Sequence, residues 1–339
     1  MKTRLGCRMP AEWEKHEATW LSWPKDPLTF PRGVIERVER AYVEMIHALT
    51  EGERVNLLVD DIATEKRVHR LMGDVDGLSI YHIKTADVWT RDYAPIFVRG
   101  KGSIVATKWI FNAWGNKYDE LKPDNEAGVE IAKSTGLKVL QPGMVLEGGS
   151  IDVNGRGMCL TSEECLLNKN RNPHLRKERI EDYLKSYLGI TSVVWLRRGI
   201  VGDDTDGHVD DTARFVSEDT VLCMVEDNLE DENHARLAEN FGVLTMARNQ
   251  EGGSLRLIPV KMPGPVVRGG RLPASYANFY IGNSVVLVPT FDHENDDSAL
   301  AQLRKAFPSR RVLGIDCRAL VYGFGGIHCV TQQQPSAQR

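Results

Sequence analysis

The sequence predicts an α/β protein in which five ββαβ-type units close into a ring. Two observations predict this fold. Strands and helices alternate in one order along the chain, and that order recurs with a unit length of about 55–70 residues. Units of this length exceed the usual solenoid repeats and carry no propeller-blade signature, so a closed ring is favoured over an open array. Accidental alternation of elements in a long α/β chain is the alternative.

Three units follow the order strand, turn, strand, helix, strand closely. Apolar and β-branched residues mark the strands, and small polar residues with glycine mark most of the turns between the first two strands of a unit. In chain order we predict strands 150–153, 158–161 and 192–196 with helix 173–188, strands 212–216, 220–225 and 254–259 with helix 232–241, and strands 276–281, 284–289 and 311–315 with helix 298–307.

Two looser units precede these three. The first is predicted as strand 18–23, helix 32–50, strand 55–59 and helix 63–72. The second is predicted as strands 93–98 and 103–109, joined by the turn Arg99-Gly-Lys-Gly, with a helix over 125–135. The whole chain, residues 1–339, is therefore expected to form a single domain.

One polar or reactive residue opens each unit: Asp92, Glu147, His208, Asn278 and Cys329. Their intervals match the length of the unit. If each residue occupies the same place in its unit, all five converge on the axis of the ring. Residues so distant in sequence would then form one site.

The composition is that of an ordinary globular protein, with 339 residues, 42% of them hydrophobic, and a net charge of −4. This charge argues against a nucleic-acid partner. No stretch approaches the ~18 apolar residues of a membrane span, and the N-terminus has no apolar signal segment, so we expect a cytoplasmic protein with no membrane association. The sequence does not fix the oligomeric state and is compatible with a homodimer.

Six cysteines are sparse for this length, and no two form a C-x-x-C pair. This pattern argues against a disulfide framework and against a cysteine-based zinc site. The sequence also lacks a phosphate-binding G-x-x-x-x-G-K-[ST] loop and a complete G-x-G-x-x-G dinucleotide fingerprint. We therefore expect neither a metal nor an organic cofactor.

Cys329 is the best candidate for a nucleophile. It ends the segment Tyr322-Gly-Phe-Gly-Gly-Ile-His-Cys329, in which Gly325 and Gly326 let the backbone approach a ligand closely. The alternative is that this thiol fills the core, because free cysteines are among the most buried residue types.

A second candidate group is the His208-Val-Asp210 sequence, within a ten-residue segment that holds five carboxylates. On an extended strand these two side chains would project from one face. The register of the segment does not fit a calcium-binding EF-hand loop. The neighbouring carboxylates of Asp203, Asp204 and Asp211 are alternatively explained as a solvated loop.

Two further segments supply an aromatic ring and carboxylates. In Trp89-Thr-Arg-Asp92, an aromatic face beside a carboxylate suits a planar cation. An ion pair of Arg91 with an aspartate, with Trp89 in the core, is the alternative. In Glu147-Gly-Gly, a carboxylate is presented where the backbone must stay slim, although such a sequence also marks simple turns.

A guanidinium substrate explains the thiol, the imidazole and the carboxylates together. Carboxylates can each bind a pair of N–H donors and hold the planar carbon over the thiolate. Addition of Cys329, with His208 protonating the departing nitrogen, releases ammonia and leaves an S-alkylthiouronium. Neutral His208 then takes a proton from water, whose attack gives a urea.

At these residues the chain resembles the agmatine deiminase family, in the peptidyl-arginine deiminase branch of the guanidine-modifying enzymes. The matching segments are Met9-Pro-Ala-Glu-Trp-Glu-Lys-His, Trp-Thr-Arg-Asp92, Phe111-Asn-Ala-Trp-Gly, Leu-Glu147-Gly-Gly-Ser, Asp-Gly-His208-Val-Asp210 and Ile-His-Cys329-Val-Thr-Gln-Gln. They occur in the order of the family and span nearly the whole chain.

The resemblance implies a pseudo-five-fold αβ propeller, the pentein fold, and hydrolysis of agmatine to N-carbamoylputrescine and ammonia. It implies Cys329 as the nucleophile, His208 and Glu147 as acid/base groups and guanidinium partners, and Asp92 and Asp210 as guanidinium-binding carboxylates. Trp89 falls where relatives place an aromatic ring against the alkyl chain of the substrate.

One segment departs from the family pattern. Agmatine-specific members tend to read Gly-Gly-Gly-Asn-Ile-His-Cys, whereas this chain reads Gly-Phe324-Gly-Gly-Ile-His-Cys329. The departure leaves the substrate open between agmatine and arginine, free or in peptides. Amidino transfer to an amine acceptor and simple polyamine binding are two further alternatives.

Overall fold

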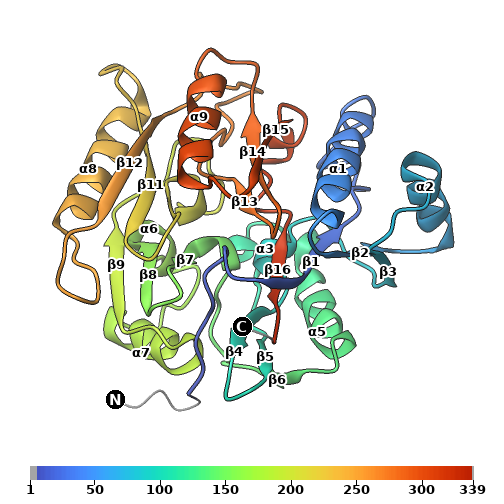
Figure 1. The fold of residues 1–339 in the computed structure, drawn as a ribbon, viewed down its shortest axis with the longest axis horizontal. Coiled ribbons are helices and arrows are strands. Elements are labelled where there is room, and N and C mark those ends of the chain that lie inside the picture. Colours follow the sequence, from blue (N-terminus) through green and yellow to red (C-terminus); the bar gives the residue numbers. More distant parts are fainter. Residues whose placement is uncertain (1–5, 338–339) are drawn as a thin grey trace.

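The structure, a computed structural model that describes residues 6–337, contains five small β-sheets arranged around a common centre (Figure 1). Four sheets have three strands each. In every one of these four, the first two strands are antiparallel and the third runs parallel to the second. Their strands are β4 (Ile96–Arg99), β5 (Ile104–Thr107) and β6 (Lys138–Leu140), β7 (Ile151–Val153), β8 (Met158–Ser162) and β9 (Ser192–Leu196), β10 (Ala213–Phe215), β11 (Thr220–Val225) and β12 (Arg256–Lys261), and β13 (Tyr280–Ile281), β14 (Val285–Thr290) and β15 (Arg311–Asp316).

The fifth sheet joins the two ends of the chain. Its order is β16 (Gln332–Pro335), β1 (His16–Ser22), β2 (Arg54–Val59) and β3 (Leu78–His82). β16 is antiparallel to β1 and lies beside it in Figure 1, where the red and blue ends of the chain meet. The strand that follows Cys329 therefore completes the N-terminal unit and closes the ring.

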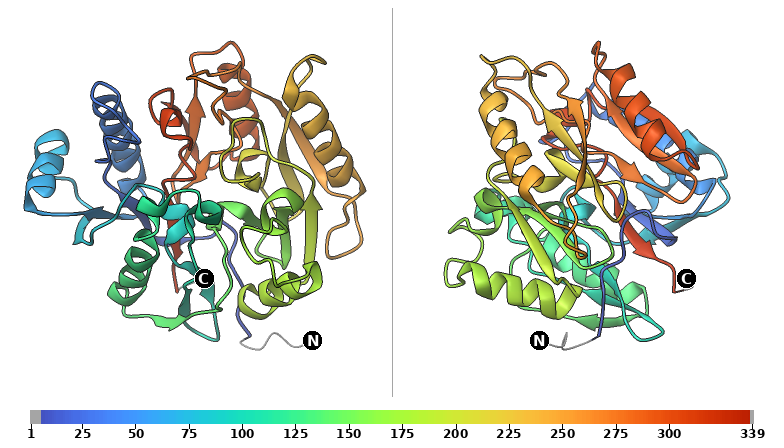
Figure 2. Two further views of the ribbon diagram at one scale, coloured as in Figure 1. Left: turned by 180° about the vertical axis from the view of Figure 1, so that it is seen from behind. Right: turned by 60° about the vertical axis from the view of Figure 1, so that its left-hand side comes forward.

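Helices connect the parallel strands and lie on the outside of the ring, as the further views in Figure 2 show. The long helices are α1 (Ile35–Thr50), α2 (Ile62–Met72), α5 (Asp124–Ser134), α7 (Lys177–Leu188), α8 (Glu232–Met246) and α9 (Asp296–Ala306). α7 shows why these sequences form surface helices: Ile180, Leu184 and Leu188 recur every fourth residue and are buried on one face.

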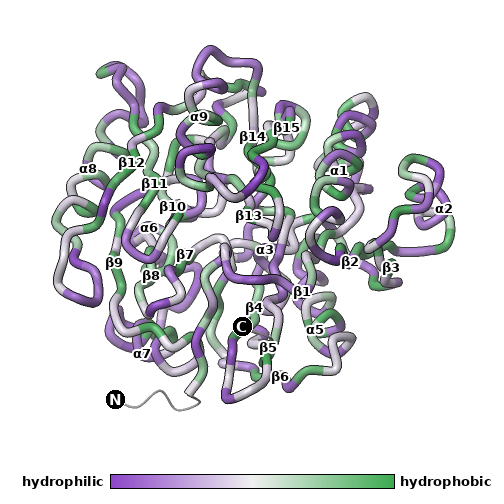
Figure 3. The backbone as a smooth tube through the Cα atoms, in the orientation of Figure 1, coloured by the Kyte–Doolittle hydropathy of each residue, from purple (hydrophilic) through white to green (hydrophobic). Residues whose placement is uncertain are grey.

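The core lies between the helices and the sheets. β14 is buried on both of its faces over Val285–Val288 and appears largely green, or hydrophobic, in Figure 3. A strand covered on both faces reads as a continuous apolar run rather than an alternation. In the described residues, 6–337, no helix is long and apolar enough to cross a membrane.

The α/β ring of five units is confirmed, with differences at particular elements. The predicted strand 276–281 shrinks to Tyr280–Ile281, because the residues around Asn278 form a turn held by side-chain hydrogen bonds. β3, β6 and β16 are absent from the prediction. β6, Lys-Val-Leu, is too short to show a periodic pattern, and β16 reads Gln-Gln-Gln-Pro, which carries no apolar signal.

A short turn precedes the first strand of each unit and carries the residue that opens that unit. Asp92 lies in α3 (Thr90–Tyr93), Glu147 precedes the 3-10 turn Gly148–Ser150, and His208 precedes the 3-10 turn Val209–Asp211. His208 and Asp210 therefore do not lie on an extended strand, the conformation in which both side chains would share one face. These turns, rather than the strands themselves, direct the polar side chains towards the centre.

Candidate active site

A cavity of about 190 Å³ opens at the centre of the ring. Three of the six predicted site residues, Trp89, Asp92 and Cys329, line it. The other three, Glu147, His208 and Asp210, are buried. The structure brings all six together, although they come from four of the five units.

Gly149 is the point at which the buried groups meet. Its backbone N–H donates to Oδ1 of Asp92 over 3.0 Å, and Nδ1 of His208 lies 3.8 Å from the same oxygen. A Cβ atom at Gly149 would lie 2.5 Å from Nδ1 of His208 and 3.1 Å from Oδ2 of Asp210. The glycine after Glu147-Gly148 therefore leaves room for the three polar side chains, in agreement with the slim backbone that the sequence suggested.

Asn278 holds the thiol of Cys329. Its Nδ2 donates to Sγ over 3.2 Å and to Oδ1 of Asp211 over 2.9 Å, and its Oδ1 accepts from the backbone N–H of His328 over 2.9 Å. Oδ2 of Asp210 lies 4.0 Å from the sulfur. Asn278, which opens the unit of β13, thus fixes Cys329, which precedes β16 in the N-terminal unit.

The protonation states follow from burial among acidic groups. Burial and the charge of Glu147 raise the pKa of Asp92 to about 7, and burial and Asp92 raise the pKa of Asp210 well above its usual range. Burial, with Asp210, Asp211 and Asp92, raises the pKa of the Cys329 thiol. Without a bound cation, the thiol is therefore neutral at neutral pH.

His208 shifts in the opposite direction. Burial and the nearby Arg171 guanidinium lower the pKa of His208 well below its ordinary value. The imidazole is therefore neutral and able to accept a proton from a neighbouring acid.

Three buried polar atoms in this cluster have no hydrogen-bond partner within residues 6–337: Oε2 of Glu147, Nε2 of His208 and Oδ1 of Asp210. A buried polar group without a partner costs about 1–3 kcal/mol. Two of these atoms are carboxylate oxygens, and a guanidinium group offers five N–H donors in one plane. The arrangement fits a flat, cationic ligand rich in donors.

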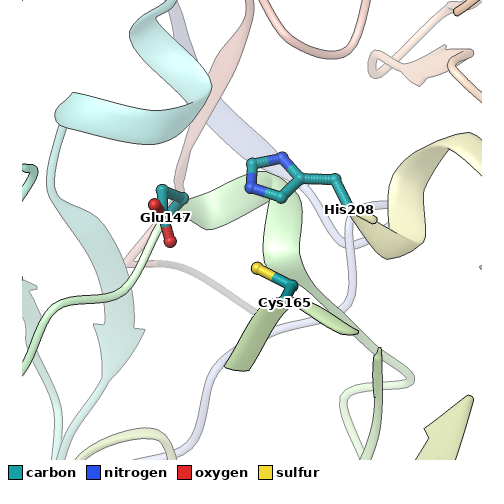
Figure 4. Close-up of side chains that lie close together, drawn as sticks. All are labelled: Glu147, Cys165 and His208. Carbon is teal, nitrogen blue, oxygen red and sulfur yellow. The ribbon is translucent and has the colours of Figure 1, made fainter. Parts of the chain in front are cut away.

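The same region offers a set of atoms that could bind a metal ion. Glu147, Cys165 and His208 place one ligand atom each within 4.8 Å of one another, with the sulfur pointing between the other two side chains (Figure 4). However, Arg171 donates to Oε1 of Glu147 over 2.6 Å, and burial raises the pKa of the Cys165 thiol well above its usual range. A fixed cation and a neutral thiol suit a divalent metal poorly.

Sequence reasoning missed Arg171 and Trp114. Arg171 binds Glu147 and also Oδ2 of Asp206, at 2.5 Å. Trp114 donates its indole N–H to Oδ2 of Asp92 over 2.9 Å, with a backbone φ of 49°. Trp114 lies in the segment Phe111-Asn-Ala-Trp-Gly, which matches a family motif. The motif indicated that this segment belongs near the site, but not that Trp114 contacts Asp92.

Two alternatives from the sequence are not supported by the contacts. Arg91 pairs with Glu12 at 3.3 Å, not with Asp92, and Trp89 lines the cavity while donating to Asp87 over 2.8 Å. For Asp203 and Asp211 the contacts do not support a solvated loop, whereas Asp204 is partly exposed and lies 3.5 Å from Lys117. Asp203 accepts from the backbone N–H groups of residues 205, 207 and 208, and Asp211 is buried against Asn278.

The ring fold and a buried thiol among carboxylates define the class of guanidine-modifying enzymes. The family model of Porphyromonas-type peptidyl-arginine deiminases matches residues 8–335. The chain is 37% identical to the agmatine deiminase of Ectopseudomonas mendocina, over 98% of this chain and 96% of the relative, and 36% identical to that of Medicago truncatula, over 98% and 97%. A solved agmatine deiminase of Enterococcus faecalis superposes with a TM-score of 0.91 at 31% identity, over 98% of this chain and 96% of that one. The chain therefore belongs to the agmatine and peptidyl-arginine deiminase family, as its motifs predicted.

Proposed function

We propose that this protein is an agmatine deiminase, which hydrolyses agmatine to N-carbamoylputrescine and ammonia. The observation that carries the proposal is the set of unpartnered buried atoms on Glu147, His208 and Asp210, of which Asp210 also places its other oxygen 4.0 Å from the thiol of Cys329. The guanidinium of agmatine supplies the donors and the positive charge that these atoms lack. Relatives that bear this name match the chain over nearly its whole length.

Binding of the cation prepares the nucleophile. The charges of Asp92, Asp210 and Asp211 oppose ionisation of the Cys329 thiol, and a guanidinium among them offsets these charges. The thiol then gives its proton to neutral His208, and the thiolate adds to the guanidinium carbon. Positioning of the substrate and electrostatic stabilisation thus account for most of the lowering of the reaction barrier.

The remaining steps need no other reactant than water. His208 returns the proton to a departing nitrogen, the C–N bond breaks, and ammonia leaves with the S-alkylthiouronium behind. His208, neutral again, takes a proton from water as the oxygen attacks. The hydroxyl proton passes to solvent as the C–S bond breaks, which releases the ureido product and the thiolate, and His208 returns its proton to the sulfur to restore the thiol.

The mouth of the cavity favours an amine over a carboxylate. Asp26, Asp87, Glu120 and Asp204 line the cavity beside Asp92, whereas Arg268 is the one cationic side chain that residues 6–337 contribute to its lining. Moreover, the Arg268 guanidinium lies 3.4 Å from the ring centroid of Tyr322 and donates to the Tyr322 carbonyl over 2.9 Å. The carboxylates of the lining therefore outnumber its cation, although Asp87 already accepts from Trp89 and Asp204 pairs with Lys117. Agmatine ends in an amine where arginine carries a carboxylate.

A steady-state assay for ureido product on agmatine, free arginine and an arginine-containing peptide tests the proposal. We expect kcat/KM for agmatine to exceed the other two by more than about a hundredfold, since a misplaced carboxylate among acidic groups is worth several kcal/mol. A preference for arginine or for the peptide would overturn the choice of substrate. Capture of the intermediate by an added amine instead of water would indicate amidino transfer.

We further propose a cytoplasmic protein of polyamine biosynthesis, with residues 1–339 as one catalytic domain that forms a homodimer. All six cysteines are free, which agrees with a reducing compartment. Light scattering coupled to gel filtration measures the assembly state, and a mass of one chain would refute the dimer.

A further inference from the structure

His328 lies between two carboxylates, and the reaction proposed above leaves it without a role. Its Nδ1 is 2.6 Å from Oδ2 of Asp210, and its Nε2 is 2.8 Å from Oε2 of Glu12. All three side chains are buried, with 1%, 0% and 5% of His328, Asp210 and Glu12 exposed. His328 therefore links a guanidinium-binding candidate to a residue of the N-terminal segment.

Counting protons shows that this link has two forms. Each of the two hydrogen bonds needs one proton, and a carboxylate supplies none. A neutral imidazole supplies only one. Hence either His328 is a cation between two carboxylates, or His328 is neutral and one carboxyl group is protonated. Both forms hold the same number of protons and carry the same net charge.

Glu12 is the carboxylate that stays ionised. It contacts Arg214 at 2.9 Å and Arg91 at 3.3 Å, and it accepts the backbone N–H of Ile281 over 2.9 Å. Although burial raises the pKa of Glu12, Arg214, His328 and Arg91 bring it well below its ordinary value. The movable proton is therefore shared by Asp210 and His328.

The surroundings place that proton on Asp210 until a cation arrives. The acidic groups that act on Asp210 are Asp92, Asp203, Asp211 and the Cys329 thiol, and they disfavour a further negative charge. Arg214 and Arg91 act on both partners: with burial they disfavour a cationic His328, which Glu12 favours, and they favour an ionised Asp210 against burial and the acidic groups. A guanidinium beside Oδ1 of Asp210, which has no partner within residues 6–337, reverses this balance.

We propose that His328 takes the proton of Asp210 when the guanidinium binds, so that Asp210 ionises without losing a proton to solvent. The O–H bond at Oδ2 of Asp210 breaks, the N–H bond at Nδ1 of His328 forms, and the carboxylate of Glu12 holds the imidazolium. The proposal rests on the function given above. His328 thus acts through Asp210, as a store for the proton that substrate binding displaces.

The direct test counts protons on binding. Calorimetry of agmatine binding is run in phosphate and in Tris, whose ionisation enthalpies differ, on the Cys329→Ala protein, in which turnover is blocked. His328→Asn is then added, because asparagine can still donate to Asp210 but cannot accept a proton. We expect up to one more proton to be released per site than by Cys329→Ala alone. Below the pKa of Asp210, affinity should also fall about tenfold per pH unit in the added variant only.

Controls separate this role from a structural one. His16→Asn removes another buried histidine, which contacts Glu53 at 3.0 Å and has no hydrogen bond or ion pair with Asp210 in the described chain, and its proton count should equal that of Cys329→Ala. In an Asp210→Asn background, His328→Asn should change the count no further. Equal proton release with and without His328→Asn, in protein shown by circular dichroism to be folded, overturns the proposal.

A second variant and a second ligand cover the cases in which His328→Asn does not fold or agmatine does not bind. If His328→Asn does not fold, Glu12→Gln replaces it, because a neutral amide cannot hold the imidazolium and the same extra proton should appear. If agmatine does not bind to Cys329→Ala, the proposed substrate is wrong. The number of protons released is then measured with arginine as the ligand. The presence or absence of the extra proton in His328→Asn then tests the role of His328 independently of the substrate.

Discussion

Arg171 donates a hydrogen bond of 2.6 Å to Glu147 beneath the site, and both side chains are fully buried. Arg171 also donates to Asp206 at 2.5 Å and to the Thr205 carbonyl at 2.7 Å, so it connects the loop before His208 to the unit that Glu147 opens. Removing one partner of a buried ion pair leaves a charge without compensation, and this loss typically amounts to about 3–5 kcal/mol.

Arg171→Met should therefore lower the free energy of unfolding by about 3–5 kcal/mol, measured by chemical denaturation. Arg198→Met is the matched control, since Arg198 pairs with Glu239 at 3.0 Å on the surface and should lose at most about 1 kcal/mol. The double variant Arg171→Met with Glu147→Gln should recover part of the loss, because the buried carboxylate is gone. Equal losses of unfolding free energy in Arg171→Met and Arg198→Met would show that the buried ion pair of Arg171 stabilises the fold no more than a surface pair.

Replacing the proposed nucleophile should separate binding from turnover. Cys329→Ala should leave less than about 1% of turnover while agmatine affinity changes by less than about tenfold. The control is Cys165→Ala. Cys165 is also buried, but its thiol does not line the cavity, so this variant should retain activity within about tenfold of the wild type. Residual turnover above that level in Cys329→Ala would remove Cys329 from its role.

The sequence predicted the units and the convergence of their first residues, because both depend on local patterns and on spacing. It could not predict the partners of those residues. Glu147 pairs with Arg171, 24 residues further along in the same unit, and Asp210 pairs with His328, 118 residues away in another unit. The second contact depends on the closure of the ring by β16, a strand of three glutamines and a proline that no hydrophobic pattern marks.

Phe324 combines backbone strain with a place at the cavity. Its φ of 70° and ψ of 24° are left-handed, a region that an aromatic residue adopts at a cost of about 1–3 kcal/mol. Gly325 and Gly326, which follow it, press against Trp89 and Asn278, so the loop has little room to relax. The side chain lines the cavity and is 41% exposed. Backbone strain that persists beside a binding site indicates a functional role. We therefore expect the Phe324 side chain to help the site discriminate between substrates.

Phe324→Gly should raise the free energy of unfolding by about 1 kcal/mol and raise the ratio of kcat/KM for arginine to that for agmatine by about tenfold. Phe324→Ala should raise the ratio without the gain in stability, because alanine keeps the strain but loses the ring. Phe324→Tyr keeps both the backbone strain and the aromatic ring, so its stability and its substrate preference should resemble those of the wild type. If Phe324→Ala left the ratio of the wild type unchanged, the ring would have no part in selectivity.

Asp92 makes stability depend on pH. Its pKa is raised from an ordinary 3.8 to about 7 in the folded protein, by burial and by Glu147. Between these values the folded state holds a proton that the unfolded state releases, so stability falls as pH rises from 3.8 to 7, and the full penalty applies above 7. Asp92→Asn removes this penalty. The stability of the variant relative to the wild type should therefore increase between pH 5 and pH 8, by at least about 1 kcal/mol, while turnover is lost.

Asp92→Asn also changes the hydrogen bonds that Asp92 accepts from Trp114 and Gly149. Any constant loss of stability from these bonds cancels when the difference between variant and wild type is compared at pH 5 and pH 8. Asp61 provides a control of opposite sign. It caps α2 by accepting the N–H of Thr64 over 2.8 Å, and that bond holds its pKa below the ordinary value. Its contribution is present above pH 4 and is lost as pH falls, so Asp61→Ala should weaken the protein more at pH 8 than at pH 3. A difference between Asp92→Asn and wild type that stays constant from pH 5 to pH 8 would show that Asp92 ionises freely in the fold.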